Sequence, residues 1–310
     1  MLLAITPNPP LDRTLHVPRL AVGAVQRATG VHLSAGGKGL NVARVARLLG
    51  CPTLASGPLA GQSGRIFAEL AGAEGIPADW YGLKSGETRT CLLINHDHGD
   101  ATVINEPGPT VSAADWRGFA AYVRQLAAAA GAVAFAGSLP PGVAADALGA
   151  LARSLATPPR AVYLDTSGPA LTAALAQPAG LCLKVNRAEL SAGLGLELAD
   201  LGQIVEAGRR LLGRGAALVV VTMGAQGAVA VSEEEAWQAT PPPIAVVSSV
   251  GSGDSFLAGL AVARWRGEAL DRALALAVAC GAANALTSLP GQLDLTTLDK
   301  LLQQVNPLRL

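Results

Sequence analysis

The sequence predicts an α/β fold: a central, mainly parallel sheet with helices on both faces and a small second sheet beside it. Three observations lead to this class. From residue 112 onward, strands that are apolar throughout alternate with helical segments, which is typical of a parallel sheet buried on both faces. Two stretches, 11–35 and 86–107, interrupt this rhythm with shorter β-like pieces. The chain has 310 residues, half of them hydrophobic, enough to bury one large core.

The apolar runs place the individual elements along the chain. LLAIT at 2–6 ends in a Pro-rich turn, as a buried strand would, and LNVARVARLL at 40–49 has one apolar helical face before Gly50 ends it. Beyond residue 112, strands are expected at 132–136, 161–165, 181–185 and 217–222. Helices are expected near 112–130, 143–155, before 181, and at 200–213, 254–266, 268–286 and 294–305, so that the last third is mostly helical. The β-like pieces include TLHV, GVHLS and two strands in 88–105 around a His-Asp-His-Gly-Asp turn.

Composition excludes several classes of function. The 23 basic residues balance the 23 acidic ones, which argues against nucleic acid or an anionic membrane as the main partner. The four cysteines show no CxxC and no metal-ligand spacing, so they are expected to be buried thiols in a reducing compartment. The N-terminus does not resemble a signal peptide, and no apolar run is long enough to span a bilayer. A soluble cytoplasmic protein is expected.

A glycine-rich segment, SAGGKGLN at 34–41, opens the helix at 40–49. Glycines allow backbone amides to approach a ligand, and a helix N-terminus favours an anion. Lys38 adds a positive charge, although the spacing is not that of a P-loop. The segment therefore predicts an anion site, with a strand-to-helix turn and a solvated lysine as the alternative.

A second such segment, GSGD at 251–254, precedes another apolar helix. Successive amides at a helix start form a nest for an anion, and the carboxylate of Asp254 beside them could accept a proton from an attacking hydroxyl. The alternative is that Asp254 caps the helix. Phe256 stands where a dinucleotide-binding fingerprint needs its last glycine, and GxGxxG follows no expected strand, which disfavours a dehydrogenase.

Two further segments follow expected strands. In KVNRAE at 184–189, Asn186 and Glu189 lie on one face of a helical turn, a spacing that suits Mg²⁺ directly or through water, while an N-terminal cap is the alternative. TMGAQG at 222–227 sits where open α/β sheets bind ligands, and it could equally be a hairpin turn.

Some polar residues are weaker candidates on their own. Asp12, Arg13 and Arg89 alone are more often solvated charges, and GSLPP at 137–141 could expose the hydroxyl of Ser138 or form a simple turn. His96 and His98 resemble a metal pair without a third ligand nearby.

Taken in order, these segments resemble the ribokinase-like carbohydrate kinases of the phosphofructokinase-B type. The most specific motifs are AGGKGLNVARVARLLG at 35–50 and VGSGDSFLAG at 250–259, supported by GETR at 86–89, GSLPPG at 137–142 and TMGAQGA at 222–228. The resemblance covers nearly the whole chain and implies a three-layer α/β/α sandwich. It implies a core formed by 1–10, 36–85 and 108–310, and an inserted β lid, 11–35 and 86–107, which would also pair two subunits as a homodimer.

The resemblance also implies ATP-dependent, Mg²⁺-assisted phosphorylation of a sugar hydroxyl. Asp254 matches the general base, and the amides of Gly251, Ser252 and Gly253 match the anion hole. Positions implied to bind the sugar substrate are Asp12, Gly37, Lys38, Asn41, Arg89 and Ser138. Positions implied to bind ATP and its Mg²⁺ are Lys184, Asn186, Glu189, Thr222, Gly224, Gly227 and Asn284, the last against the adenosine. The sequence departs from the family pattern at Val185, where proline is usual, and at Val250, where threonine is usual.

Arg89 and Lys38 together suggest a substrate that already carries a phosphate, because a guanidinium can hold phosphate bidentately. TPNPPLDRTLHV at the start and NEPGP at 105–109 most resemble the branch of 1-phosphofructokinases and tagatose-6-phosphate kinases. We therefore expect fructose 1-phosphate as the substrate, with tagatose 6-phosphate and then fructose 6-phosphate as alternatives. A sugar-phosphate-binding regulator without catalysis is a different class of alternative, which the retained Asp254 disfavours.

Overall fold

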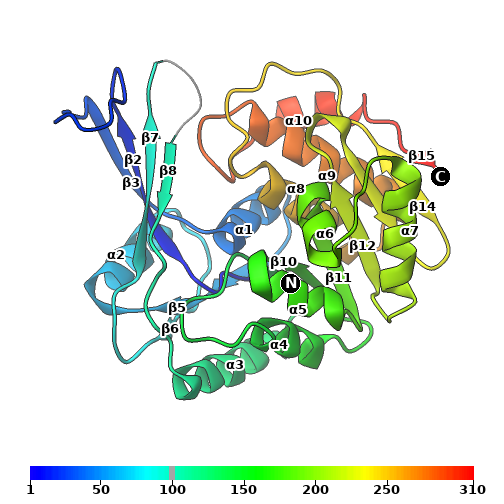
Figure 1. The fold of residues 1–310 in the computed structure, drawn as a ribbon, viewed down its shortest axis with the longest axis horizontal. Coiled ribbons are helices and arrows are strands. Elements are labelled where there is room, and N and C mark those ends of the chain that lie inside the picture. Colours follow the sequence, from blue (N-terminus) through cyan, green and yellow to red (C-terminus); the bar gives the residue numbers. More distant parts are fainter. Residues whose placement is uncertain (98–101) are drawn as a thin grey trace.

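The computed structural model describes residues 1–97 and 102–310 and has three layers around one large sheet (Figure 1). Within this part of the chain, the large sheet has nine strands. From one edge to the other they are β4 (Thr53–Ser56), β1 (Leu2–Ile5), β9 (Ala132–Ala136), β10 (Ala161–Asp165), β11 (Leu181–Asn186), β12 (Leu218–Thr222), β13 (Ala228–Val231), β14 (Ala236–Ala239) and β15 (Leu308–Arg309). Pairing is parallel from β4 to β12 and antiparallel from β12 to β15.

Both faces of the large sheet are covered because its strands are apolar on both sides. In β1, Leu2 and Ala4 belong to one core cluster, and Leu3 and Ile5 belong to the other, as the period of two along a strand requires. The first cluster packs against α1 (Lys38–Leu48), α2 (Gly61–Ala73), α8 (Ser252–Trp265), α9 (Leu270–Ala285) and α10 (Leu295–Leu302). The second packs against α3 (Ala113–Ala127), α4 (Ala147–Leu155), α5 (Gly168–Ala176), α6 (Arg187–Leu194) and α7 (Leu201–Leu212).

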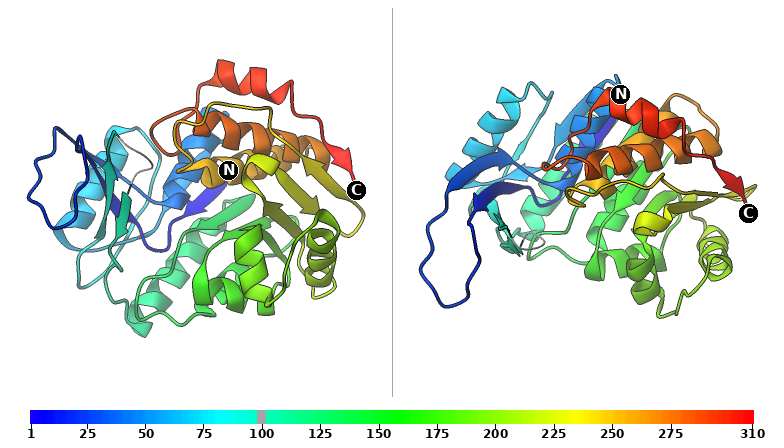
Figure 2. Two further views of the ribbon diagram at one scale, coloured as in Figure 1. Left: turned by 45° about the horizontal axis from the view of Figure 1, so that its top comes forward. Right: turned by 90° about the horizontal axis from the view of Figure 1, so that it is seen from above.

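A separate small sheet stands at one side of the three layers (Figures 1 and 2). Its order is β3 (Gly30–Ala35), β2 (Pro10–His16), β7 (Arg89–Asn95) and β8 (Thr102–Asn105). The central pair, β2 and β7, is parallel and joins two segments far apart in the sequence. The 17–29 connection between β2 and β3 extends away from the body (Figure 2, right). We call these four strands and the 17–29 connection the lid.

The fold class predicted from the sequence is confirmed: a mainly parallel sheet between helices, with a small second sheet. The expected strands at 132–136, 161–165, 181–185 and 217–222 are present within one residue at each end. The helix expected from 143 begins at Ala147, and the one expected from 254 begins at Ser252.

Other elements were not predicted. Helix α2, a short parallel pair of β5 (Pro58–Leu59) with β6 (Tyr81–Gly82), and the antiparallel strands β13 and β14 are all additions. The TMGAQG segment is a hairpin turn: a 3-10 turn, Gly224–Gln226, joins β12 to the antiparallel β13. No helix in the described part of the chain is long and apolar enough to cross a membrane.

All four cysteines are buried and free, as expected. Burial raises the pKa of the Cys91 thiol to about 11 and those of Cys182 and Cys280 to about 12. Burial also raises the pKa of the Cys51 thiol. Cys91 lies in β7 of the lid, whereas Cys182 and Cys280 lie in β11 and α9 of the core.

Candidate active site

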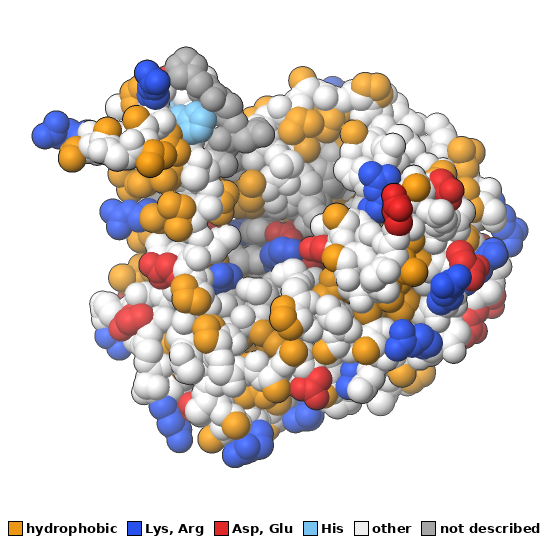
Figure 3. All heavy atoms as spheres, in the orientation of Figure 1, with side chains coloured by type: hydrophobic (Ala, Val, Ile, Leu, Met, Phe, Trp, Pro, Cys, Tyr) orange, Lys and Arg blue, Asp and Glu red, His pale blue; other side chains and the backbone are white. Residues whose placement is uncertain are grey.

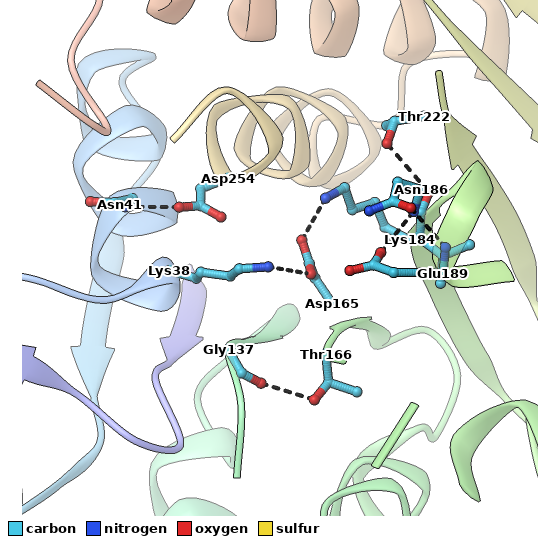
Figure 4. Close-up of polar contacts among 11 residues, drawn as sticks. Lys38, Asn41, Gly137, Asp165, Thr166, Lys184, Asn186, Glu189, Thr222 and Asp254 are labelled. Carbon is cyan, nitrogen blue, oxygen red and sulfur yellow. Dashed lines mark hydrogen bonds and ion pairs between the residues drawn. The ribbon is translucent and has the colours of Figure 1, made fainter. Parts of the chain in front are cut away.

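Several of the predicted site residues, among them Lys38, Asn41, Lys184 and Asp254, lie together near the carboxyl ends of β10 and β11 and the first turns of α1 and α8 (Figure 4). This is the edge at which open parallel sheets bind ligands. The surface is hollowed between the lid and the main body, and acidic and basic side chains lie together in the hollow (Figure 3). The site is described below from α8 outward.

Asp254 is the third residue of α8 and is 5% exposed. Its side chain does not cap the helix, because the N-cap position belongs to Gly251 and has no side-chain hydrogen bond. Instead, the Nδ2 of Asn41 in α1 donates to the Asp254 Oδ2 over 2.8 Å. The carboxyl group therefore points out of its own helix and into the space that Lys38 and Asp165 also face (Figure 4).

Burial raises the pKa of Asp254 to about 6, because removing water disfavours the ionised form. The charge of Lys38 opposes this effect, the nearby Asp165 adds to it, and the Asn41 hydrogen bond and Lys184 lower the pKa again. A pKa near the working pH suits a group that must accept a proton and later release it.

The GSG turn before Asp254 leaves amides available. Gly251 adopts a positive φ of 83° and lies against Pro290, so a Cβ there would be 2.6 Å from the proline Cβ. Among the described residues the amides of Gly251 and Gly253 have no backbone acceptor, whereas Ser252 donates its amide to the Ser249 carbonyl over 3.2 Å. Two of the three amides expected to form the anion hole are thus free to bind a ligand.

A buried carboxylate, Asp165, joins two lysines at the floor of the site. Its Oδ2 accepts from the Lys184 Nζ over 2.6 Å and its Oδ1 from the Lys38 Nζ over 3.1 Å. Burial raises the pKa of Asp165, but the two ammonium groups outweigh it and the result is below the ordinary value. The Lys184 Nζ lies 2.9 Å from where a Cβ on Gly253 would be, so a positive charge lies against the free amides.

The first turn of α1 is built against β1 and β2. Gly37 has a φ of 105°. A Cβ on Gly39 would be 2.5 Å from the Ile5 backbone, so only glycine fits there. The carboxylate of Asp12 occupies the space beside Gly36. Burial raises the pKa of Asp12 to about 6, although Arg44 and Arg89 lower it. Asp12, Gly37, Lys38 and Asn41 are thus brought together, as the motif implied.

Asn186 and Glu189 form a capping box at the start of α6. The Glu189 amide donates to the Asn186 Oδ1 over 2.8 Å, and the Asn186 amide donates to the Glu189 Oε2 over 2.9 Å. The alternative interpretation, a helix cap, is therefore what the structure contains. The Glu189 carboxylate still points toward Asp165 and Lys184 (Figure 4), and its Oε1 has no hydrogen bond within the described residues.

The remaining predicted residues lie farther from Asp254 or are occupied by structural contacts. Arg89 donates from its Nε to the Asn8 carbonyl and from its Nη1 to the Glu106 carbonyl, and Ser138 is half-buried after β9. Thr222 donates weakly to the Val185 carbonyl over 3.4 Å, and Gly224 lies in the hairpin turn. Gly227 is required by packing, since a Cβ there would be 1.9 Å from the Ala239 carbonyl oxygen.

Asn284, which the family resemblance places against the adenosine, is a structural residue in this conformation. Its side chain is completely buried in α9, with its Oδ1 accepting from the Ser255 Oγ and the Gly291 amide and its Nδ2 donating to the Val250 carbonyl. No part of its side chain is exposed in this conformation, so it could not contact an adenosine. Asn284 instead connects the start of α8 and the residue before the GSG turn to the 290–291 loop.

The metal interpretation of the His96 and His98 pair concerns a residue that the structure does not describe. His98 falls outside the described residues, and no group of three or more His, Cys, Asp or Glu side chains in the described part of the chain could hold a metal ion.

A model of the pfkB family carbohydrate kinases matches residues 10–296. The chain belongs to this family. It is 38% identical over 265 residues to a 1-phosphofructokinase of Xanthomonas campestris pv. campestris, covering 84% of this chain and 83% of the relative. As a pfkB kinase, it is an ATP-dependent phosphotransferase that acts on a sugar hydroxyl.

Solved pfkB structures superpose along almost the whole chain. Phosphofructokinase-2 from Escherichia coli in complex with potassium gives a TM-score of 0.91 at 28% identity, with 98% of both chains covered. The same enzyme in complex with fructose-6-phosphate gives a TM-score of 0.89, also at 28% identity and 98% coverage of both chains.

Sequence reasoning missed two residues that organise this kinase site. Asp165 is the last residue of the apolar strand expected at 161–165, and Arg44 lies within the helix expected at 40–49. The one signal for Asp165 was a single charge at the carboxyl end of AVYLD, where a parallel strand delivers its side chain to the site. Arg44 lies within the same motif as Asn41 and donates to its Oδ1 over 2.7 Å.

Proposed function

We propose that this kinase transfers the γ-phosphoryl group of ATP to the O6 hydroxyl of fructose 1-phosphate, giving fructose 1,6-bisphosphate and ADP. The observation that carries the proposal is the buried carboxylate of Asp254 beside the free amides of Gly251 and Gly253. The identity to a 1-phosphofructokinase over most of the chain supports this choice of sugar.

Asp254 is proposed as the general base. Asn41 occupies its Oδ2, which leaves Oδ1 to accept the hydroxyl proton of the sugar. As that proton moves to Oδ1, the sugar oxygen forms a bond to the γ-phosphorus, and the bond from the γ-phosphorus to the oxygen of the departing ADP breaks. Asp254 then releases the proton to solvent.

The transferring group carries negative charge, and the proposed anion hole suits it. The free amides of Gly251 and Gly253 at the start of α8 would donate hydrogen bonds, and the ammonium groups of Lys38 and Lys184 lie on the same side of the site (Figure 4). The carboxylates of Asp165, Asp254 and Glu189 outweigh the effect of burial and raise the pKa of Lys38, which keeps it charged. These residues bind the transferring phosphoryl group and neutralise its negative charge. None of them forms a covalent intermediate with it.

The donor set also fits Mg²⁺ bound with ATP. Mg²⁺ usually takes one or two protein carboxylates together with substrate phosphates and water, and Glu189 offers the free Oε1 of a carboxylate fixed by its capping box. We propose that Glu189 and Asn186 hold the ion through water. When bound, Mg²⁺ would reduce the charge repulsion between ATP and the incoming hydroxyl.

The phosphate already on the sugar is proposed to lie near Arg89 and Ser138 at the base of the lid. Two guanidinium nitrogens of Arg89 are fixed by main-chain carbonyls, which would hold the third in a defined direction. Fructose 6-phosphate is a second candidate substrate, because a solved relative of closely similar fold was obtained in complex with it.

The test is a coupled assay of ADP release with fructose 1-phosphate, tagatose 6-phosphate, fructose 6-phosphate and fructose. We expect the highest kcat/KM with fructose 1-phosphate and loss of at least about 100-fold in kcat for Asp254→Asn. A higher kcat/KM with another sugar phosphate would overturn the substrate assignment. Binding of sugar phosphates without any ADP release would overturn the kinase activity itself and favour a regulator.

We further propose a homodimer formed through the lid. Val31 and Leu33 of β3, and Val103 and Ile104 of β8, are 38–59% exposed on its two edge strands, and Val22 and Val25 of the 17–29 connection are fully exposed. Apolar side chains on sheet edges favour pairing with another chain. Sedimentation should give twice the monomer mass, and Val31→Lys with Leu33→Lys should give the monomer.

A cytoplasmic location is also proposed, because it fits the four free thiols.

A further inference from the structure

Arg44 of α1 is a nearly buried residue that the proposed mechanism does not use. Its side chain is 12% exposed, and each of its guanidinium nitrogens is occupied. Its Nε and Nη2 donate to the two carboxylate oxygens of Glu74, each over 2.7 Å. Its Nη2 also donates to the Ala35 carbonyl at the end of β3, and its Nη1 donates to the Asn41 Oδ1 over 2.7 Å.

The bond to Asn41 fixes which way the asparagine amide faces. A guanidinium can only donate, so the group facing Arg44 must be the amide oxygen of Asn41. The amide nitrogen is then turned to the opposite side, where it donates to the Asp254 Oδ2 over 2.8 Å. Packing helps, because Gly291 lies close against Asn41: a Cβ on Gly291 would be 3.0 Å from both the Cα and the Oδ1 of Asn41.

Glu74 and Ala35 in turn fix the guanidinium itself. Glu74 is the C-cap residue of α2, and Ala35 is the last residue of the lid strand β3. A bidentate carboxylate contact holds a guanidinium in one plane. The orientation of Asn41 is therefore determined by contacts that extend to both α2 and the lid.

We propose that Arg44 is a positioning residue for phosphoryl transfer: it orients the Asn41 amide, which holds the Asp254 carboxylate in its productive direction. The proposal rests on the function proposed above for Asp254. No hydrogen bond or ion pair joins Arg44 to Asp254 among the described residues, and the hydrogen-bonded link between them runs through Asn41. Arg44 also lowers the pKa of Asp12, so the test must separate the two effects.

Loss of Arg44 would free the Asn41 amide to turn over. Its oxygen could then face the Asp254 carboxylate, and the hydrogen bond that favours the ionised form would be lost. The charged groups that act on Asp254 from the neighbouring elements are Lys38 of α1, Asp165 of β10 and Lys184 of β11. Asp12 of β2 also interacts with Asp254, and loss of Arg44 would raise the pKa of Asp12, because Arg44 lowers it. With the Asn41 hydrogen bond lost, the pKa of Asp254 would rise, and less of the base would be ionised near neutral pH.

The test compares Arg44→Met with Arg47→Met. Both substitutions remove a guanidinium from α1, but Arg47 donates to the main-chain carbonyl of Glu74 and does not contact Asn41. We expect Arg44→Met to lower kcat by about 10- to 100-fold with KM for ATP within about threefold, as expected for a displaced catalytic group. The acid limb of the kcat profile should move up by about one pH unit. Arg47→Met should stay within about twofold of wild type.

A double-mutant cycle separates positioning from a general structural loss. In an Asn41→Ala chain, Arg44→Met should lower kcat by less than about threefold further, because the residue through which it acts is gone. The proposal is overturned if Arg44→Met costs the same factor in both backgrounds, or no more than Arg47→Met. If Arg44→Met does not fold, Arg44→Lys replaces it, since one ammonium group cannot reach both Asn41 and Glu74.

A readout without turnover distinguishes this proposal from the proposed function. The carboxyl carbon resonance of Asp254, followed by NMR in the substrate-free protein, should titrate at a higher pH in Arg44→Met than in Arg47→Met. An unchanged titration overturns the positioning role even if the enzyme is active. Absence of ADP release from the wild type overturns the proposed function and leaves this comparison intact.

Discussion

Asp254→Asn is expected to make the protein more stable while it removes activity. Asparagine has nearly the same shape and can still accept the hydrogen bond from the Asn41 Nδ2, so the main change is the loss of an ionisable group. Asp254 is 5% exposed, and its ionised form is disfavoured by burial in the folded protein. The folded state therefore holds a charge that the unfolded chain would carry more easily in water.

The size of the effect follows from linkage. The pKa of Asp254 is raised from 3.8 to about 6; a difference of about 2 corresponds to about 3 kcal/mol at a pH above both values. Because the folded state binds the proton more tightly, wild-type stability falls as pH rises from about 4 to about 6 and is then constant. The advantage of Asp254→Asn should therefore be about 3 kcal/mol at pH 7.5, about half of that at pH 5, and less than about 1 kcal/mol at pH 4.

The assay is urea unfolding of both proteins at these three pH values, followed by the fluorescence of the four tryptophans. The exposed Asp299 of α10 provides the matched control, since Asp299→Asn changes the same chemical group outside the site. The reasoning is refuted if Asp254→Asn is no more stable than wild type at pH 7.5, or if its advantage does not shrink toward pH 4. A loss of less than about tenfold in kcat would exclude Asp254 as the general base.

Substitutions at Gly39, Lys184 and Asn284, with Gly72→Ala as a control, test the framework around the site. Gly39→Ala should destabilise the protein by several kcal/mol, because the Cβ would lie 2.5 Å from the Ile5 backbone, whereas Gly72→Ala in α2 has open space and should stabilise it by about 0.5–1 kcal/mol in thermal unfolding. Lys184→Met should destabilise the protein by about 3 kcal/mol, since it leaves the Asp165 carboxylate with one partner. The same urea assay checks this: adding Asp165→Asn to Lys184→Met should restore part of the lost stability. Asn284→Ala should cost about 3 kcal/mol and lower kcat, because it removes two buried hydrogen bonds, to Ser255 and Gly291, and a half-buried one to the Val250 carbonyl next to the GSG turn. An unchanged unfolding midpoint would contradict this.

Most of the large sheet was predictable because its strands are continuous apolar runs between helices with one apolar face. Helix α2 was not, because three glycines, at 61, 64 and 72, weaken its helical pattern and its N-cap residue, Ala60, gives no side-chain signal. The antiparallel strands β13 and β14 are only four residues long. Such short runs have too few residues to show a period.

The site was predictable where one segment carries the whole signal. GSGD places the free amides and Asp254 within four residues, so the sequence is enough to locate them. Asp165 is different: its partners lie 127 and 19 residues away, and a single aspartate after a strand says nothing about which lysines it meets. Asn284 has the same difficulty, since its bond to Val250 spans 34 residues. Its identity as a buried connection depends on how α8 and α9 pack.

Because one cysteine lies in the lid and others lie in the core, thiol reactivity can reveal which part of the fold has opened. Alkylating reagents attack the thiolate, and burial in the fold suppresses that form at Cys91, Cys182 and Cys280 near neutral pH. Separation of the strands that surround Cys91 would make that thiol reactive while the other two stayed protected inside the core. Alkylation followed residue by residue in a mass spectrometer would thus distinguish lid motion from global unfolding, without any added label.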